Sequence, residues 1–339
     1  MNLKRAAGYA TLLLLAGCQS NHSMLWSSAS KQASDIEWLY WFIFWICLVV
    51  FILVIAFFAG GAAKSNIDEA EMAPVMESNE PGDRRAKVGV SIALAITTGT
   101  LFVVLAFSIV TGKTTAGLSS KNPVTIQVIG HQWWWELRYP NSQADLTVTG
   151  ANEIHLPVGQ PVVVLTASRD VIHSFWAPNV DGKRDLLPGY QSAFTFKIDK
   201  PGIYHGQCAE FCGEQHAHMG FEIVAESMDD FQNWLQQQRK PAVEPQDPTA
   251  IRGREVFLTH ACVLCHTIRG TDAGSKVGPD LTHVASRRLL AATEISNAPG
   301  SLAGWISDPQ RIKPGAKMPA NPLPPADLNA LVTYLRSLQ

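Results

Sequence analysis

Two long runs without a charged residue dominate the first third of the chain, at residues 38–59 and 88–110. They contain 22 and 23 residues, and a helix needs about 20 apolar residues to cross a bilayer. Four aromatic side chains of the kind found at membrane interfaces open the first run: Trp38, Tyr40, Trp41 and Trp45. The pattern predicts two transmembrane helices, at residues 36–60 and 88–111, and so a lipid bilayer as one partner.

The segment between the two runs carries basic residues close to the predicted helix ends. They are Lys64, Arg84, Arg85 and Lys87. Because basic loops stay on the cytoplasmic side, we predict that residues 61–87 form a cytoplasmic loop. The rest of the chain after residue 111 is then outside, which predicts a protein of the bacterial inner membrane with soluble domains in the periplasm.

The amino terminus has the pattern of a secretory signal. Lys4 and Arg5 precede an apolar stretch at residues 6–16, and small residues lead to Cys18. This resembles a bacterial lipoprotein signal at residues 1–17, which implies a lipidated Cys18 and a periplasmic lead at residues 18–35. The alternative is an ordinary signal peptide in which Cys18 is incidental.

After the second run the pattern changes twice. Residues 112–227 contain short β-rich runs, such as 124–129 and 161–165, separated by turn residues, which predicts an all-β sandwich or barrel with antiparallel strands. Residues 228–248 are polar and rich in Gln and Pro, which predicts a semi-rigid linker after a short amphipathic turn. Residues 249–339 are helical in pattern, and Leu328, Leu331 and Leu335 mark one face of a last amphipathic helix.

The two soluble parts carry opposite charge. Residues 112–248 have 10 Lys and Arg against 15 Asp and Glu, a net of −5, and residues 249–339 have 10 against 6, a net of +4. We therefore expect the cationic domain to dock on the acidic one through a flexible linker, with an electron transfer rate between them that falls as salt is added. The chain has no basic run interleaved with aromatic residues, so we expect no nucleic-acid partner.

Cys262, Cys265 and His266 have the spacing of a covalent haem c attachment site, in which two thiols bind the haem and the imidazole binds the iron. Met318, the one methionine after His266, is the candidate for the second axial ligand. The alternatives for the cysteine pair are a redox dithiol or half of a zinc site. His260 and His283 are the other candidate iron ligands, and we expect both to be structural.

A second group of soft donors lies at residues 208–219. Cys208 and Cys212 could each bridge two metal ions, and His216 and Met219 follow on the same loop. Sulfur and imidazole together favour copper, and His173 is the best candidate for a distant imidazole. The alternatives for the cysteines are the thiol pair of a copper chaperone or a disulfide, and His205 and His218 are the rival histidines.

Residues 249–339 resemble class I cytochromes c. The resemblance rests on the haem motif, on Met318 between prolines, and on residues 278–281, where the family has a loop packed under the proximal histidine. It also rests on Gly253 and Phe257, where the family's first helix crosses its last helix, here against Tyr334. The resemblance implies an all-α cytochrome c domain.

Residues 124–225 resemble the CuA domain of cytochrome c oxidase subunit II, a cupredoxin barrel of Greek-key topology. By position, the resemblance implies that Cys208 and Cys212 bridge two copper ions, that His173 and His216 are terminal ligands, and that Met219 is a weak ligand. It also implies that Glu210 binds copper by its backbone carbonyl and helps to bind magnesium by its side chain. Trp133 is implied as the residue where electrons enter from the donor cytochrome.

Together these parts resemble subunit II of a caa-type bacterial oxidase, in which the haem domain is fused to the subunit. The resemblance implies subunit I (with haem a and CuB), subunit III and a donor cytochrome c or other periplasmic donor as partners. Oxygen reduction and proton translocation would then belong to subunit I. Many such chains carry a glutamate near the start of the second span, whereas residues 88–94 have no carboxylate, so we expect protons to enter elsewhere.

Three other functions remain as alternatives. A quinol oxidase subunit II lacks the copper ligands that this chain has, and a nitrous oxide reductase needs a large catalytic propeller for which the chain has no room. The third alternative, a membrane-tethered electron shuttle that is not part of an oxidase, has the same ligands.

Overall fold

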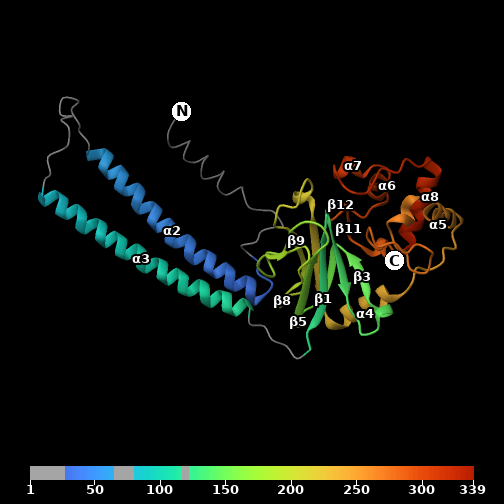
Figure 1. Cartoon of the computed structure of the whole chain (residues 1–339), viewed down its shortest axis with the longest axis horizontal. Coiled ribbons are helices and arrows are strands. Elements are labelled where there is room, and N and C mark those ends of the chain that lie inside the picture. The colour runs from blue at the N-terminus through green and yellow to red at the C-terminus, as the bar shows by residue number, and fades with distance from the viewer. Residues whose placement is uncertain (1–26, 65–79, 117–121) are drawn as a thin grey trace, which may run out of the picture. The chain divides into compact units, whose positions relative to one another are not determined.

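The computed structural model describes residues 27–64, 80–116 and 122–339 (Figure 1). The predicted signal peptide, Cys18 and most of the predicted cytoplasmic loop lie outside the described residues. The chain divides into two compact units, residues 34–117 and the remainder, and each is described by itself.

The first unit is a pair of long helices, α2 (Lys31–Lys64) and α3 (Glu80–Ala116). The ring of Phe107 lies 5.2 Å from that of Trp38 and 5.1 Å from that of Phe42, so the start of α2 packs beside the end of α3. Apolar side chains cover the outside of both helices, and Phe57 is 80% exposed. Both helices are long and apolar enough to cross a membrane, and such a surface is stable in lipid rather than in water.

The β-rich part is a domain of two five-stranded sheets. The first sheet has the order β3-β2-β1-β5-β8 and consists of β1 (Val124–His131), β2 (Trp134–Tyr139), β3 (Val148–Ala151), β5 (Pro161–Ser168) and β8 (Ser192–Lys197). The second has the order β4-β10-β9-β6-β7 and consists of β4 (Glu153–Pro157), β6 (His173–Trp176), β7 (Arg184–Leu186), β9 (Gly202–Cys208) and β10 (Gly220–Glu226). Short helical turns lie at η2 (Ala144–Leu146) and η3 (His216–His218).

The core of this domain, which we call the barrel, lies between the two sheets. Along β5, Val162 and Val164 are fully buried and alternate with partly exposed residues, which is the pattern of a strand with one face on the core. The prediction of an all-β domain is confirmed. The expectation that its strands are antiparallel was wrong for two pairs, because β1 runs parallel to β5 and β4 runs parallel to β10.

The region predicted as a linker begins with a helix, α4 (Met228–Arg239). Ser227 caps it by accepting a hydrogen bond from the Asp230 amide at 3.1 Å. Phe231 and Leu235 are four residues apart and are buried in the barrel core. The predicted amphipathic turn is therefore a full helix, and the residues between α4 and the next helix connect the two domains.

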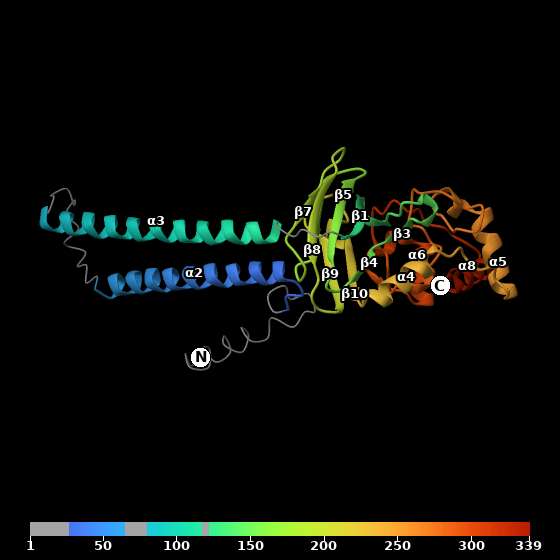
Figure 2. The ribbon, with the colours of Figure 1, turned by 90° about the horizontal axis from the view of Figure 1, so that it is seen from below.

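The carboxyl-terminal domain is helical. Its helices are α5 (Pro248–Thr259), α6 (Pro299–Ser307), α7 (Pro309–Ile312) and α8 (Pro325–Ser337), with turns at η4 (Ala261–Leu264) and η5 (Val284–Ser286) and a short pair of strands, β11 (Leu289–Leu290) and β12 (Ile295–Ser296). A side chain at Gly253 would place its Cβ 1.9 Å from the Ala330 carbonyl oxygen, so glycine permits α5 to cross α8. Phe257 packs on Tyr334 at this crossing, as predicted. The domain lies against the barrel in both views (Figure 2).

Candidate functional site: a sulfur and imidazole cluster beside a haem cavity

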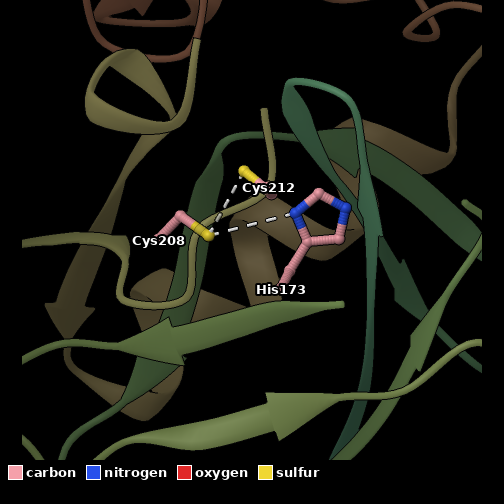
Figure 3. A group of neighbouring side chains, drawn as sticks. All are labelled: His173, Cys208 and Cys212. Carbon is pink, nitrogen blue, oxygen red and sulfur yellow. Dashed lines mark hydrogen bonds between the residues drawn. The ribbon is translucent and has the colours of Figure 1, made fainter. Parts of the chain in front are cut away.

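The sequence-predicted copper residues meet where two neighbouring strands end. His173 is the first residue of β6 and Cys208 is the last residue of β9, and the two strands are paired through Phe175 and Cys208. Figure 3 shows the Sγ atom of Cys208 between two other donors. It lies 3.7 Å from Cys212 Sγ and 3.9 Å from His173 Nδ1. All three residues are buried.

The remaining predicted donors surround the same two sulfurs. His216 Nδ1 lies 3.7 Å from Cys212 Sγ, and Met219 Sδ lies 3.9 Å from it on the buried side. The carbonyl oxygen of Glu210 lies 3.2 Å from Cys208 Sγ. The structure therefore brings together all six residues predicted from the sequence to form the copper site.

Backbone contacts hold the loop that carries these donors. The Cys208 amide donates to the Met219 carbonyl at 3.0 Å, which closes the loop at its base. The Ala209 amide donates to the Ser174 carbonyl at 2.9 Å, which fixes the loop beside His173. A side chain at Gly130 would place its Cβ 2.6 Å from His173 Cδ2, so the glycine on β1 makes room for the imidazole.

The electrostatics of the cluster favour a bound cation. The hydrogen bond between the two thiols lowers the pKa of Cys208 and raises that of Cys212, since two thiolates this close repel one another. Burial alone would lower the pKa of His173, but hydrogen bonds with Asp170 and Cys208 raise it. Positive charge between the sulfurs would stabilise a second thiolate, and soft sulfur donors with imidazole fit copper.

The rival histidines of the barrel have other partners. His205 Nδ1 lies 3.5 Å from a Glu222 oxygen, and His218 Nδ1 lies 3.0 Å from a Glu294 oxygen. Neither is part of the cluster of His173 and the two cysteines. His173 and His216, by contrast, contact the cysteine sulfurs.

A cavity of about 700 Å³ lies beside this cluster, and both domains line it. Its helical side contains the predicted haem residues Cys262, Cys265, His266 and Met318, and its barrel side contains His131, Gln132, Trp133 and Trp134. The size and the apolar lining fit a flat macrocycle, and the two thiols and one imidazole fit covalent haem attachment.

His266 is oriented for metal binding. Its Nδ1 donates a hydrogen bond to the Pro279 carbonyl oxygen at 2.7 Å, which leaves the lone pair of Nε2 available to a metal. Burial lowers the pKa of His266, so the ring is neutral, which is the form that binds iron. A Cβ at Gly278 would lie 2.7 Å from His266 Cε1, so the loop can pack under the ring only with glycine there.

Gln310 holds the loop that carries Met318. Its side-chain amide donates to the carbonyl oxygens of Ala316 and Met318 at 2.8 and 3.0 Å, and it accepts from the Gly315 amide. Gly315 has a φ of 82°, a conformation that favours glycine. The loop therefore keeps a defined shape at the cavity edge.

The other two histidines of the helical domain are engaged by backbone carbonyls. His260 Nδ1 lies 2.9 Å from the Val256 carbonyl oxygen. His283 contacts the carbonyl oxygens of Gln339 and Lys240 through its two ring nitrogens, at 2.8 and 3.0 Å. Neither lines the cavity.

Trp133 connects the cavity to the cluster, and two residues not expected from the sequence support it. Trp133 Nε1 and Gln132 Nε2 both donate to the Cys212 carbonyl oxygen, at 3.0 and 2.8 Å. Asp170 accepts from the Gln132 amide at 2.7 Å and contacts His173 Nε2 at 2.8 Å. Only their places in the sequence could have indicated these two residues, because Gln132 precedes Trp133 and Asp170 lies three residues before His173.

Comparison with known proteins assigns a family to each domain. Residues 143–228 match the family described as "Cytochrome C oxidase subunit II, periplasmic domain", and residues 250–339 match the cytochrome c family. Cytochrome c oxidase subunit 2 of Alkalihalophilus pseudofirmus is 37% identical over 70% of this chain and 70% of that protein. Cytochrome c oxidase subunit 2 of Bacillus sp. PS3 is 32% identical over 65% of this chain and 63% of that protein.

Among solved structures, the periplasmic domain of cytochrome oxidase subunit II of Bradyrhizobium japonicum aligns with 36% of this chain and 97% of its own, at 29% identity and a TM-score of 0.34. The sequence relationships and the two domain matches lead to one assignment. The chain belongs to the cytochrome c oxidase subunit 2 family and carries a cytochrome c domain at its carboxyl end.

Proposed function

We propose that electrons pass from a donor cytochrome c, or another periplasmic donor, through haem c and binuclear CuA of this chain to haem a of subunit I. Oxygen reduction and proton translocation then belong to subunit I. The observation that carries the proposal is the position of Trp133, which lines the haem cavity and is hydrogen-bonded to residues 208–219, here called the copper loop. Trp133 is thus the residue through which we expect electrons to reach the copper site.

The proposed copper site uses the six donors around the two sulfurs. Cys208 and Cys212 would bridge two ions, with His173 and His216 as terminal ligands and with Met219 and the Glu210 carbonyl as weaker ones. Bound copper supplies a one-electron redox couple. The chain contributes rigidity, because the loop is closed by backbone hydrogen bonds at its base, and Asp170 keeps the His173 ring in one orientation.

The proposed haem site uses Cys262 and Cys265 as covalent attachments, and His266 and Met318 as axial ligands. Bound haem c supplies a second one-electron couple, and a thioether ligand raises its reduction potential. The Pro279 carbonyl would orient the His266 ring, and Gln310 would hold the backbone of the loop that carries Met318, through the hydrogen bonds described above.

Exposed side chains around the copper loop fit a surface for subunit I. Phe211 is 76% exposed, and the neighbouring Glu210 side chain is also exposed. The segments that flank β6 and β7 add further exposed apolar side chains: Val171, Ile172, Leu187 and Tyr190. We propose that subunit I, with subunit III in the same assembly, covers this surface and that the Glu210 carboxylate helps to bind magnesium at the boundary.

The segment that precedes the membrane helices indicates on which side of the membrane the barrel lies. The chain just before α2 is bonded to the barrel, because the Ala29 amide donates to the Asn179 carbonyl at 2.8 Å and the Ala29 carbonyl accepts from Asp199 at 2.7 Å. The lead segment and the barrel are therefore on one side of the membrane. We propose that this side is the periplasm and that the helices span the bacterial inner membrane.

The decisive experiment is affinity purification of the full chain in mild detergent. We expect a haem a-containing subunit and oxygen consumption to accompany it, with two copper ions and one covalent haem per chain, the stoichiometry of a bridged pair and a single haem motif. A Cys212→Ser variant should lose copper, whereas Cys47→Ser in α2, a matched control, should keep it. A chain that carries both metals but purifies alone would instead support the electron shuttle.

A further inference from the structure

Lys313 is a buried cation between the two domains. Its side chain is only 3% exposed, although it belongs to a loop of the helical domain. Its ammonium contacts the carbonyl oxygen of His218 at 2.7 Å, that of Ala291 at 3.1 Å and that of Trp133 at 3.2 Å. An ammonium has three donors, so each donor has one acceptor. The two acceptors in the barrel are His218, within the copper loop, and Trp133, which is hydrogen-bonded to that loop.

The same loop carries Met318. Next to Lys313, the Pro314 carbonyl accepts a hydrogen bond at 2.7 Å from the buried Gln215 side chain of the copper loop. Three residues from Pro314, Lys317 lies 3.4 Å from Asp170, which also contacts His173. One short segment therefore joins the proposed iron ligand to the proposed copper ligands.

The backbone of the helical domain at residues 291–293 also contacts the barrel. Ala291, Ala292 and Thr293 have φ values of 54°, 58° and 76°, which are unfavourable for residues with a side chain. The Ala291 carbonyl accepts from Lys313, and the Ala292 carbonyl accepts from the Gly220 amide of β10 at 3.1 Å. The contact of Ala292 with the barrel thus stabilises a backbone that the isolated loop would not favour.

Charged contacts continue the interface. The Arg288 guanidinium lies 3.2 Å from a Glu222 oxygen whose side chain is 2% exposed, and the Arg288 amide donates to Glu153 at 2.9 Å. A basic residue of the helical domain here meets acidic residues of the barrel, as the net charges of the two domains predict. The Glu222 carboxylate is buried but the Arg288 side chain is 53% exposed, so salt should weaken this ion pair in part.

The connection between the domains is also held in place. Arg269 of the helical domain donates to the Gln238 carbonyl and, at 3.2 Å, to the Arg239 carbonyl at the end of α4. His283 contacts the Lys240 carbonyl at 3.0 Å. The expectation that the domain docks through a flexible linker therefore needs correction, since the start of the connection is bonded to the domain that it carries.

We propose that Lys313 is a positioning residue for internal electron transfer, which fixes the haem cavity in register against Trp133 and the copper loop. This inference rests on the proposed function. Without the ammonium, three backbone carbonyls lose this donor and the docked state loses a contact that joins the two domains. Burial lowers the pKa of Lys313 to about 8, so the ammonium form still predominates at neutral pH.

The first test uses the full chain without substitution. An amine-reactive reagent is applied under native conditions, and mass spectrometry compares Lys313 with the exposed Lys276 and Lys317. We expect Lys313 to react at least about tenfold more slowly than either of them, as an amine does that is reached only when the interface opens. Because the lowered pKa of Lys313 leaves more of its reactive free amine, reaction of Lys313 faster than Lys317 would show that it is open to solvent and would overturn the proposal.

The second test compares Lys313→Met with Arg252→Gln. The control removes the same charge from an exposed position on α5, where Arg252 pairs with Asp327 of the same domain. In Lys313→Met we expect the rate from haem c to CuA to fall about tenfold, and the Gly220 amide to exchange faster with deuterium, while the haem and copper spectra stay unchanged. Equal rates and equal exchange in the two variants would overturn the proposal.

The outcomes separate the two proposals. Absence of the haem or copper spectrum from the unsubstituted chain would contradict the proposed function and would leave the labelling result for Lys313 intact. Normal spectra together with rapid labelling of Lys313 would contradict only the positioning role.

Discussion

The indole Nε1 of Trp133 donates a hydrogen bond to the carbonyl oxygen of Cys212 at 3.0 Å. The same ring lines the cavity that contains the haem-binding residues. A single side chain therefore contacts both proposed redox sites, and the contact to the copper loop runs through a hydrogen bond rather than through space. The role of the Trp133 indole can therefore be tested by substitution.

Substitution of Trp133 by Phe should slow electron transfer from haem c to CuA. The phenyl ring keeps an aromatic group at the cavity wall but removes the donor to Cys212, and a hydrogen bond of about 1 kcal/mol corresponds to about a fivefold effect. Rapid photoreduction of haem c, followed by the absorbance of copper, measures the rate. Trp234→Phe, on α4 against His155, is the control, and equal rates in the two variants would contradict the prediction.

Substitution of Met318 by Ala should remove the near-infrared absorption band of sulfur-ligated ferric haem. The haem should stay covalently attached, because Cys262 and Cys265 are unchanged, and the reduction potential should fall without the thioether. Met228→Ala on α4 removes a thioether far from the haem motif in the sequence and should keep the band. An unchanged band in Met318→Ala would exclude Met318 as the axial ligand.

The local motifs were predictable because their chemistry lies in short segments or in a recognisable spacing. The haem cysteines, His266 and the copper loop each occupy a few consecutive residues, and only His173 and Met318 had to be matched over a distance. The two-sheet domain also followed from alternating burial, as along β5. The sequence pattern contains these features directly.

The interface between the domains was not predictable in the same way. Lys313 has the sequence context of an ordinary surface lysine, and its three carbonyl partners come from residues far apart in the chain. A backbone carbonyl can belong to any residue type, so no sequence motif identifies these acceptors. The parallel pairs of strands were missed for a related reason, since the alternation of burial is the same for both strand directions.

Substitution of Gly278 by Ala should destabilise the haem domain. The added Cβ would lie 2.7 Å from His266 Cε1, so either the loop or the imidazole has to move, at a cost of about 1–3 kcal/mol. Gly274→Ala is a matched control on the same loop, since a Cβ there meets nothing within 4 Å. Thermal unfolding followed at the haem band measures the difference, and equal midpoints in the two variants would refute this reading of Gly278.

His155 should make the barrel more stable at mildly acidic pH than at alkaline pH. Its ring lies between two carboxylates, 2.9 Å from Glu226 and 3.2 Å from Glu153, and stacks on Trp234 of α4. Burial alone would lower the pKa of His155, but the hydrogen bonds to Glu153 and Glu226 outweigh it and raise the pKa. A raised pKa in the folded state means that the imidazolium is stabilised by folding.

The sign of the pH dependence follows from this shift. The stabilisation is complete below the pKa of His155 in the unfolded chain, about 6.5, and it is lost as pH rises through the higher pKa of the folded state. The thermal midpoint should therefore fall between about pH 6 and about pH 8 by more in the unsubstituted chain than in His155→Gln. His260→Gln, at an exposed position on the haem domain, should keep the full dependence, and identical curves for all three proteins would show that the pair of carboxylates does not stabilise the imidazolium.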